Sequence, residues 1–323
     1  MRLILTVWQL EILKPINDWG VYMKDIAAIV VTYNRVTLLK NCLDALSAQT
    51  YPLKKIFVVD NASSDSTKEF LEAFRSKMPL EVICLETNQG GAGGFYEGLS
   101  VAHKKGAFDG FWLMDDDGVP AETCLEELLK YSEDYPYVCP LVLDIEDDTR
   151  LAFPRNGTHD LDSFMSVHKG QTVIENMSAP FNGILLRKDM VDKVGYPKKE
   201  MFIWGDEVEY NLRSAYFGFI PVTVVKAIHR HPVDRLIRKD CILKKGIIID
   251  VDSQLRNYCK YRNTAYALKK YRGWSKVLGL YIIYMTYFLF QDRWNWKKFQ
   301  FFHNAFMDGI KEDFSKHVKY IGK

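Results

Sequence analysis

FWLMDDDGV, residues 111–119, places three aspartates directly after a run of large apolar residues. An apolar run of this length is typical of a strand that is buried on both faces. Neighbouring carboxylates repel one another, so three of them at the mouth of a core usually need a cation. The stretch therefore predicts a buried strand that ends in a cation site. The alternative is an acidic turn between a strand and a helix, with Asp117 as the helix cap.

Three more apolar segments lie upstream and end in polar residues: IAAIVVTYN (26–34), KKIFVVDNASSD (54–65) and LEVICLE (80–86). A helix signal follows each of them. These signals are helical spacing from Leu38 to Ala48, a cap at Asp65 or Ser66, and a glycine-rich loop (88–98) that enters a helix. The alternation predicts an α/β fold with a mostly parallel sheet flanked by helices on both faces, and the chain after about Asp252 predicts a C-terminal helical region.

Polar side chains lie at the ends of all four predicted strands: Asn34, Asp60, Asn88 and Asp115–Asp117. Ligands of parallel sheets bind beyond the carboxyl ends of the strands. Any one of these residues could be a simple strand cap, but four together indicate a binding site. Oxygen ligands suit a hard cation such as magnesium or manganese, and such a cation suits a diphosphate.

The composition sets the outer limits of the interpretation. The 323 residues are 48% hydrophobic and 26% charged, which is enough for a sizeable core in one large domain or two ordinary ones. The net charge of +2 gives no reason to expect a nucleic-acid partner. The six cysteines are scattered without a CxxC pair, so we expect free thiols in a reducing compartment.

Five motifs occur in the order IVVTYNR, VVDNASSD, NQGGAGGFYEG, WLMDDDG and WGDEVEYNLR. Together they resemble family-2 glycosyltransferases with the GT-A fold, over about residues 26–232. The combination of GGAGGF with DDD is most similar to the galactofuranosyltransferases, which take galactofuranose from UDP-galactofuranose. Rhamnosyltransferases that use dTDP-rhamnose are the second choice. The resemblance implies a metal-dependent, inverting sugar transfer to a glycan acceptor in cell-surface polysaccharide synthesis.

The resemblance also implies a donor site at the strand ends. Thr32, Tyr33 and Asp60 would line the nucleotide pocket, where Asp60 accepts a hydrogen bond from the uracil imide. Asn88, Gly91 and Gly93 would lie against the donor, because glycine lets the backbone approach a ligand closely. The acidic motif would contact the ribose and the metal through Asp115 and Asp117, with Asp116 beside them. A dinucleotide-binding loop is excluded, because these glycines follow the third strand and not the first.

WGDEVEYNLR, residues 204–213, carries the candidate base. An inverting transfer needs a group that takes the proton of the acceptor hydroxyl. The resemblance puts Glu207 in the base position, but the family more often has Asp there, so Asp206 stays an alternative. Both acids begin a helix whose dipole favours their ionised form. They could also be a capping cluster, and Trp204 could stack on a sugar or belong to the core.

AIHRHP, residues 227–232, follows an apolar strand. The resemblance implies a histidine metal ligand at this point. His229 matches best, and His231 points to the same face of an extended chain. We therefore expect Asp115, Asp117 and His229 to bind magnesium or manganese.

The C-terminal region contains VLGLYIIYMTYFLFQ, residues 277–291, which is too short to span a membrane comfortably. Its borders are basic and aromatic, which suits a membrane interface. The border residues are Lys269, Lys270, Arg272, Trp274, Arg293, Trp294, Trp296, Lys297 and Lys298. We expect a cytoplasmic protein that binds peripherally to the inner face of the membrane, close to a lipid-linked acceptor. The alternatives are core packing and a homo-oligomer contact.

The domain boundaries follow from these motifs. Residues 1–22 carry Glu11 and lack a small-residue cleavage site, so we interpret them as an extension or a mis-set start before Met23, and not as a signal peptide. We expect a GT-A catalytic domain at 23–235 and a helical, aromatic and basic region at 236–323.

Two other classes of function deserve comparison with the glycosyltransferase hypothesis. A nucleotidyltransferase would need a basic residue in its glycine-rich loop, and NQGGAGGFYEG has none. A nucleotide-sugar-binding protein without catalysis would not need the DDD motif together with the acidic pair. The acceptor, the linkage and the oligomeric state stay open at this level.

Overall fold

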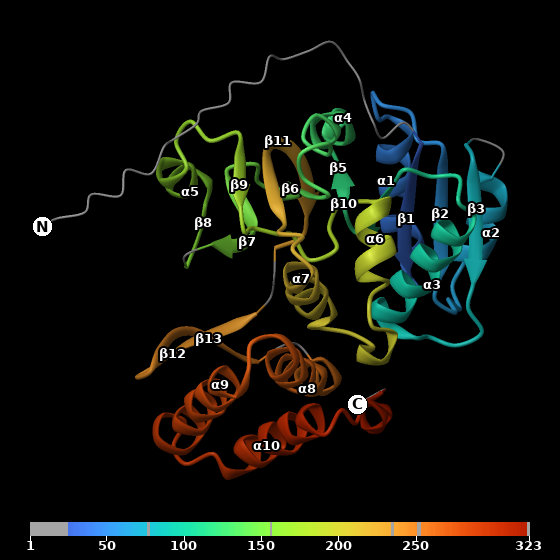
Figure 1. The fold of residues 1–323 in the computed structure, drawn as a ribbon. Helices are drawn as coiled ribbons and strands as arrows, with labels where there is room; N and C mark the ends of the chain where they lie inside the picture. The colour runs from blue at the N-terminus through green and yellow to red at the C-terminus, as the bar shows by residue number, and fades with distance from the viewer. Residues whose placement is uncertain (1–24, 76–77, 156, 234–235, 251–252, 322–323) are drawn as a thin grey trace, which may run out of the picture.

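A computed structural model describes residues 25–75, 78–155, 157–233, 236–250 and 253–321 (Figure 1). The predicted extension at 1–22 lies outside the described residues. The N-terminal half contains β1 (Ile26–Thr32), α1 (Val36–Ser47), β2 (Lys55–Asp60), α2 (Thr67–Phe74), β3 (Leu80–Cys84), α3 (Gly90–Lys104), β4 (Gly110–Asp115), β5 (Val119–Pro120), α4 (Cys124–Leu129), β6 (Tyr137–Asp144), β7 (Arg150–Arg155), β8 (Thr158–Asp160) and α5 (Leu161–Val167).

The second half continues this pattern and then becomes helical. It contains β9 (Val173–Glu175), β10 (Ile184–Arg187), α6 (Lys188–Val194), the 3-10 turn η1 (Lys199–Met201), α7 (Asp206–Tyr216), β11 (Val222–His231), β12 (Ile237–Cys241), β13 (Lys244–Asp250), α8 (Gln254–Tyr271), α9 (Trp274–Thr286), the π-helical turn η2 (Tyr287–Gln291), α10 (Trp296–Ile310) and the 3-10 turn η3 (Ser315–Tyr320).

The central sheet has the strand order β3-β2-β1-β4-β10-β6-β11-β5. Strands β3, β2, β1 and β4 are parallel to one another, and β11 is parallel to β6, whereas β10 is antiparallel to both of its neighbours. The prediction of a mostly parallel sheet flanked by helices, followed by a C-terminal helical region, is therefore confirmed.

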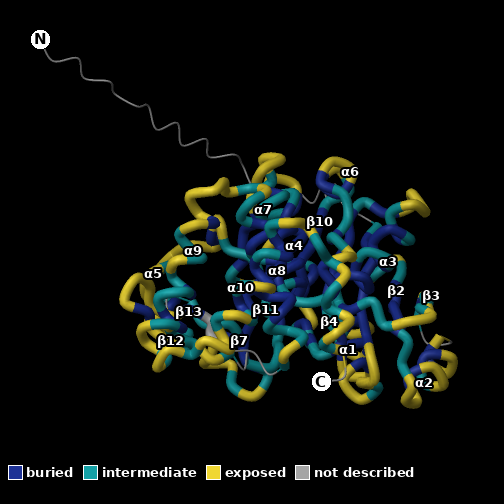
Figure 2. Tube along the Cα trace, turned by 90° about the horizontal axis from the view of Figure 1, so that it is seen from below, coloured by how far each residue is buried: buried dark blue, intermediate teal, exposed yellow. Residues whose placement is uncertain are grey.

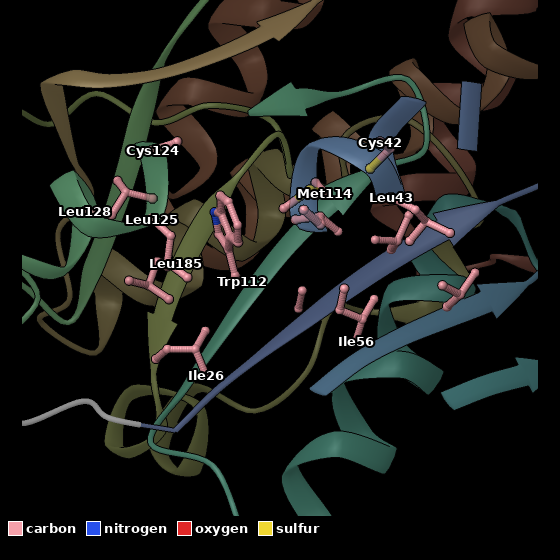
Figure 3. Close-up of a cluster of buried hydrophobic side chains, with 14 of the residues drawn as sticks. Ile26, Cys42, Leu43, Ile56, Trp112, Met114, Cys124, Leu125, Leu128 and Leu185 are labelled. Atoms are coloured by element: carbon pink, nitrogen blue, oxygen red, sulfur yellow. The ribbon is translucent and has the colours of Figure 1, made fainter. Parts of the chain in front are cut away.

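Helices cover both faces of the sheet, which explains why its strands are apolar without interruption. All seven residues of β1 are buried. Ile26, Ala28 and Val30 belong to the core under α1, α2 and α4, part of which Figure 3 shows around Trp112 and Leu43. The alternate residues of β1 belong to the core under α3, α6 and α7. A strand with helices on both sides has no solvent face, so it has no polar alternation.

The glycine-rich segment differs from the prediction of a loop, because α3 already begins at Gly90. The glycines allow this helix to lie directly on β1. A Cβ atom at Gly94 would come within 2.4 Å of a Val31 methyl carbon, and one at Gly98 would come within 2.6 Å of an Ile29 methyl carbon. The first turn of α3 is thereby fixed against the strand that ends in the candidate nucleotide site.

The C-terminal region forms a separate core below the sheet (Figure 1). Helices α8, α9 and α10 and the β12–β13 hairpin share one hydrophobic cluster that is rich in tyrosine and phenylalanine. Helix α8 contacts α7, and most of its residues from Tyr258 to Ala267 are buried. Figure 2 colours the trace of the whole molecule by burial, with buried residues in dark blue. Among the described residues, no helix is both long enough and apolar enough to cross a membrane.

Candidate functional site

The three aspartates lie where β4 ends, beside the end of β1. The register pairs Val31 of β1 with Asp115 of β4. Asp116 is only 2% exposed and accepts a hydrogen bond from Thr32 Oγ1 at 2.7 Å. The two strand ends are thus joined by a side-chain hydrogen bond, which brings predicted donor residues from separate motifs into one site.

A cation that the sequence analysis did not single out sits among these carboxylates. Arg35 Nη1 lies 2.8 Å from Asp117 Oδ2 and 3.2 Å from Asp116 Oδ1. Arg35 follows the end of β1 by three residues, in IVVTYNR. Its proximity to the strand end was the available signal, but the sequence alone does not show which way a long side chain turns.

The two candidate histidines occupy different positions. His231 Nε2 lies 3.1 Å from Asp117 Oδ1. His229 is fully buried, and neither of its ring nitrogens has a hydrogen-bond partner among the described residues. The reason is the pairing of β11 with β5, which sets His229 opposite Pro120 and beside the turn at Gly118. The geometry therefore favours His231 over His229 as the imidazole that acts with Asp117.

Burial and mutual repulsion shift the protonation of the aspartates. Burial raises the pKa of Asp115, and the charges of Asp117 and Asp116 raise it further. Burial also raises the pKa of Asp116 to about 6, although Arg35 and Thr32 oppose the shift. Burial would raise the pKa of Asp117 as well, but the hydrogen bond and charge of His231, with help from Arg35, hold it below its usual value. The site is short of positive charge.

The donor chemistry of this edge fits a divalent cation. Asp115, Asp117 and His231 offer carboxylate oxygens and one imidazole nitrogen, which suit manganese and, for the oxygens, magnesium. Asp117 and His231 are in contact, but no group of three or more such side chains among the described residues is arranged around a common point that could hold an ion. The fit therefore rests on ligand type and on the unbalanced negative charge.

The predicted nucleotide residues lie along the neighbouring strand ends. Asp60 is 5% exposed and accepts a hydrogen bond from the Ser63 amide at 2.9 Å. Asn88 Oδ1 accepts from the Gly90 amide at 2.8 Å, at the start of α3. Tyr33 is 43% exposed, so its ring is open to solvent and to a ligand. These residues and the first turn of α3, with Gly91 and Gly93, border the same sheet edge.

Asn61 is a further residue that the sequence analysis missed. Its side chain accepts from the Gln89 amide at 2.8 Å and donates to the Gly90 carbonyl at 2.9 Å, while Asn61 itself is 2% exposed. One buried amide thus fixes the end of β2 to the start of α3. An asparagine directly after a strand aspartate carries no sequence signal for this long-range role.

The acidic pair begins α7 on the other side of the site. Asp206 is 5% exposed, and burial raises its pKa well above the usual value, with further contributions from Glu207 and from Asp115. Glu207 is half-buried, and its Oε2 accepts from the Gly205 amide at 3.1 Å.

The residues on either side of the pair have structural contacts. Glu209 forms an ion pair of 2.9 Å with Arg213, which lies four residues further along α7. It also accepts a hydrogen bond of 2.8 Å from the Tyr271 hydroxyl. Trp204 packs against the C-terminal hydrophobic cluster and has a positive φ of 63°. The structure therefore gives Trp204 a packing role, and a role in sugar stacking stays a prediction.

Comparison with known proteins identifies the chain as a glycosyltransferase. A family model described as glycosyl transferase family 2 matches residues 27–195, and the chain belongs to this family. It is 33% identical over 255 residues to galactofuranosyltransferase GlfT1 from Mycolicibacterium smegmatis, and the match covers 76% of this chain and 83% of that protein.

Solved structures support the GT-A fold. Staphylococcus aureus TarS 1–349 in complex with UDP-GlcNAc aligns with a TM-score of 0.56 at 16% identity, covering 90% of this chain and 82% of that one. The mannosyltransferase PcManGT from Pyrobaculum calidifontis, in complex with GDP-Man and Mn²⁺, aligns with a TM-score of 0.55 at 15% identity, covering 90% and 75%.

Gly90→Ala should destabilise the protein, whereas Gly91→Ala should not lower its stability. Gly90 has a φ of +70°, and a Cβ there would lie 2.0 Å from the Phe202 carbonyl oxygen. Backbone strain alone costs about 1–3 kcal/mol. Gly91 is helical with nothing within 4 Å of a Cβ, so alanine should be neutral or stabilise by up to about 1 kcal/mol. Urea unfolding measures the stability of each variant. Equal stability of the two variants would contradict the packing of α3 against Phe202.

Asp117→Asn should lower the pKa of His231, measured by NMR of the imidazole in EDTA. Burial would lower this pKa, but the hydrogen bond and charge of Asp117 raise it above its ordinary value. The raised pKa of His231 gives stability that is complete below about pH 6.5 and is lost as the pH rises through the folded value. The lowered pKa of Asp117 gives stability that is present above about pH 4 and is lost in acid.

The same substitution should therefore cost most stability between about pH 4 and pH 6.5 and less at alkaline pH. Urea unfolding at about pH 5.5, inside this window, and at about pH 9 measures the difference from the wild type under each condition. The spectrum of His231→Gln identifies the resonance. A His231 pKa that is unchanged by Asp117→Asn would show that the two side chains are not paired in solution.

Proposed function

We propose that this enzyme transfers galactofuranose from UDP-galactofuranose, with inversion at the anomeric carbon, to a glycan acceptor in cell-surface polysaccharide synthesis. The observation that carries the proposal is the 33% identity to a galactofuranosyltransferase over 76% of the chain. The GGAGGF segment and the DDD motif support it, because both border the edge of the sheet where ligands of this architecture bind.

The donor would lie along the ends of β1, β2 and β4. Asp60 would accept from the uracil imide, with Thr32 and the exposed ring of Tyr33 lining the nucleotide pocket. Asn88, Gly91 and Gly93 would lie under the donor, where the first turn of α3 offers free amide groups. Asp115 and Asp116 would contact the ribose, and Trp204 would border the sugar.

Asp115, Asp117 and His231 would hold magnesium or manganese, with His231 in the place that the sequence analysis assigned to His229. The bound cation would supply positive charge for the diphosphate as it leaves. Arg35 already forms ion pairs with Asp116 and Asp117, so it is placed to neutralise negative charge at the same edge of the sheet.

Glu207 is the better candidate for the base. Asp206 is 5% exposed and its pKa is raised by burial, so it keeps its proton and is a poor acceptor for another. Glu207 is half-buried at the first turn of α7, where the helix dipole favours a carboxylate. It would take the proton of the acceptor hydroxyl, with Asp206 beside it in the chain.

The acceptor would be lipid-linked, and the protein would bind peripherally to the inner face of the membrane. Trp274, Leu278 and Ile282 are exposed at a spacing of four residues, so they form one stripe along α9. Phe290 and Trp294 continue it at 65% and 60% exposure. Exposed cations flank the stripe at Lys276, Arg293, Lys297 and Lys298. An apolar, aromatic stripe with basic borders suits an anionic bilayer surface.

Release of UDP should be fastest with UDP-galactofuranose in a panel that includes UDP-galactopyranose, UDP-GlcNAc and dTDP-rhamnose. Activity should disappear in EDTA and return with excess magnesium or manganese. Asp117→Ala should be inactive but folded. A preference for dTDP-rhamnose would make the enzyme a rhamnosyltransferase. Binding of a nucleotide sugar without turnover under all conditions would make it a binding protein.

Glu207→Gln should lower kcat by about 10²–10⁴-fold, because removal of a general base has this typical cost. Binding of UDP, measured by calorimetry, should be unchanged, because Glu207 is assigned to the acceptor hydroxyl and not to the nucleotide. Asp206→Asn is the matched comparison. If Glu207→Gln keeps its activity and Asp206→Asn is inactive, the base is Asp206.

The protein should float with vesicles that contain anionic lipid at low salt, and less so at high salt, because part of the attraction is electrostatic. Leu278→Ser combined with Ile282→Ser should reduce flotation. Val167→Ser is the control, because Val167 is 68% exposed on α5, at a distance from α9 (Figure 1). If the wild type stays in the soluble fraction at low salt, the stripe is better explained as an oligomer contact.

A further inference from the structure

The segment that precedes the acidic pair has an unusual backbone. Phe202 has a φ of 65°, Trp204 a φ of 63° and Gly205 a φ of 85°. Residues other than glycine rarely adopt positive φ, and the strain persists only where surrounding contacts hold it. The segment from Met201 to Gly205 therefore needs partners, and the structure shows where they come from.

The partners are two side chains of α8 in the C-terminal region. Asn263 Nδ2 donates to the carbonyl of Met201 at 3.0 Å, to that of Ile203 at 3.2 Å, and to that of Trp204. Arg262 Nη2 donates to the Met201 carbonyl at 2.7 Å. Both side chains are 0% exposed. A buried amide surrounded by three carbonyl oxygens has one favourable orientation, so it holds the segment in one shape.

Asn263 is itself held in place. Arg262 Nε donates to Asn263 Oδ1 at 2.9 Å, which directs the amide nitrogen toward the carbonyls. A Cβ at Gly205 would lie 3.0 Å from Asn263 Cβ, so α8 passes directly beside the start of α7. Any shift of Asn263 would be transmitted to the residue before Asp206.

The same segment reaches the donor side of the site. The Phe202 carbonyl accepts from the Ala92 amide at 3.0 Å, in the first turn of α3. The ring of Phe202 stacks on His317 with centroids 4.6 Å apart. Five residues thus connect the glycine-rich turn of α3, the acidic pair of α7 and the C-terminal helices.

We propose that Asn263 is a positioning residue for the transfer reaction. By fixing the Met201–Gly205 segment, it holds the acidic pair of α7 and the donor-side turn of α3 in one mutual geometry. The C-terminal region is then part of the active site's support. This inference rests on the proposed function, because it assumes that Asp206 and Glu207 act on the acceptor.

The test compares Asn263→Ala with Tyr258→Phe in the full chain. Tyr258 lies on the same helix, is 1% exposed, and donates to Asp308 at 2.8 Å. Its ring also lies 5.4 Å from the Arg262 guanidinium, and phenylalanine keeps this ring, so the variant loses a buried hydrogen bond and retains the ring against Arg262. A misplacement of about 1 Å can cost about 10²-fold in rate. Asn263→Ala should therefore lower kcat by about 10–10²-fold, with KM for the donor changed by less than about threefold. Tyr258→Phe should change neither constant by more than about twofold.

Hydrogen–deuterium exchange tests the geometry without any catalytic activity. In Asn263→Ala, exchange should become faster in the peptides that contain Ala92 and residues 201–210, and it should be unchanged in β2 and in α4. If the wild type transfers no sugar, the proposed function is wrong. The exchange pattern would still show whether Asn263 holds the segment in place.

If Asn263→Ala does not fold, His317→Ala takes its place in the same measurements. His317 is half-buried, stacks on Phe202 and lies 3.4 Å from Arg262 Nη1 through its Nδ1, so its loss should give the same changes in kcat and exchange at smaller size. The inference is overturned if Asn263→Ala, or His317→Ala in its place, leaves exchange at Ala92 and 201–210 unchanged. A loss of kcat no larger than that of Tyr258→Phe overturns it as well.

Discussion

The repulsion among the three carboxylates at the end of β4 is the constraint on which the rest of this site depends. Asp116 is buried and Asp115 and Asp117 are half-buried, so water screens their charges only in part. Three side chains contact these carboxylates: Thr32 from β1, Arg35 from the turn after β1, and His231 from the end of β11. These contacts relieve part of the repulsion only, which leaves the edge ready to take up a cation and a diphosphate.

The order of the strands follows from this requirement as much as from hydrophobic burial. Strand β1 lies beside β4, which brings Thr32 and Arg35 to the aspartates. The short strand β5 leaves the aspartate turn and pairs with β11, which brings His231 to Asp117 from more than a hundred residues away.

Much of the fold could be predicted because its signals are local. Uninterrupted apolar runs mark β1, β2 and β4, and helical spacing marks the connections between them. The helical start of α3 was not predicted, because it depends on the close approach of Gly94 and Gly98 to β1. The choice between His229 and His231 could not be made either. Both point to the same face of one strand, and only the pairing of β11 with β5 decides which of them meets Asp117.

The sequence by itself determined the class of the protein: the parallel strands, the polar residues at their ends, and the acidic pair at the start of a helix are all encoded within short stretches. The tertiary structure alone decided which side chains complete the site. Arg35 turns toward the aspartates because β4 lies next to β1, and Asn263 supports the acidic pair because α8 packs under α7. These contacts join residues that are distant along the chain, and a hydrogen bond across such a distance depends on packing that no local pattern of residues specifies.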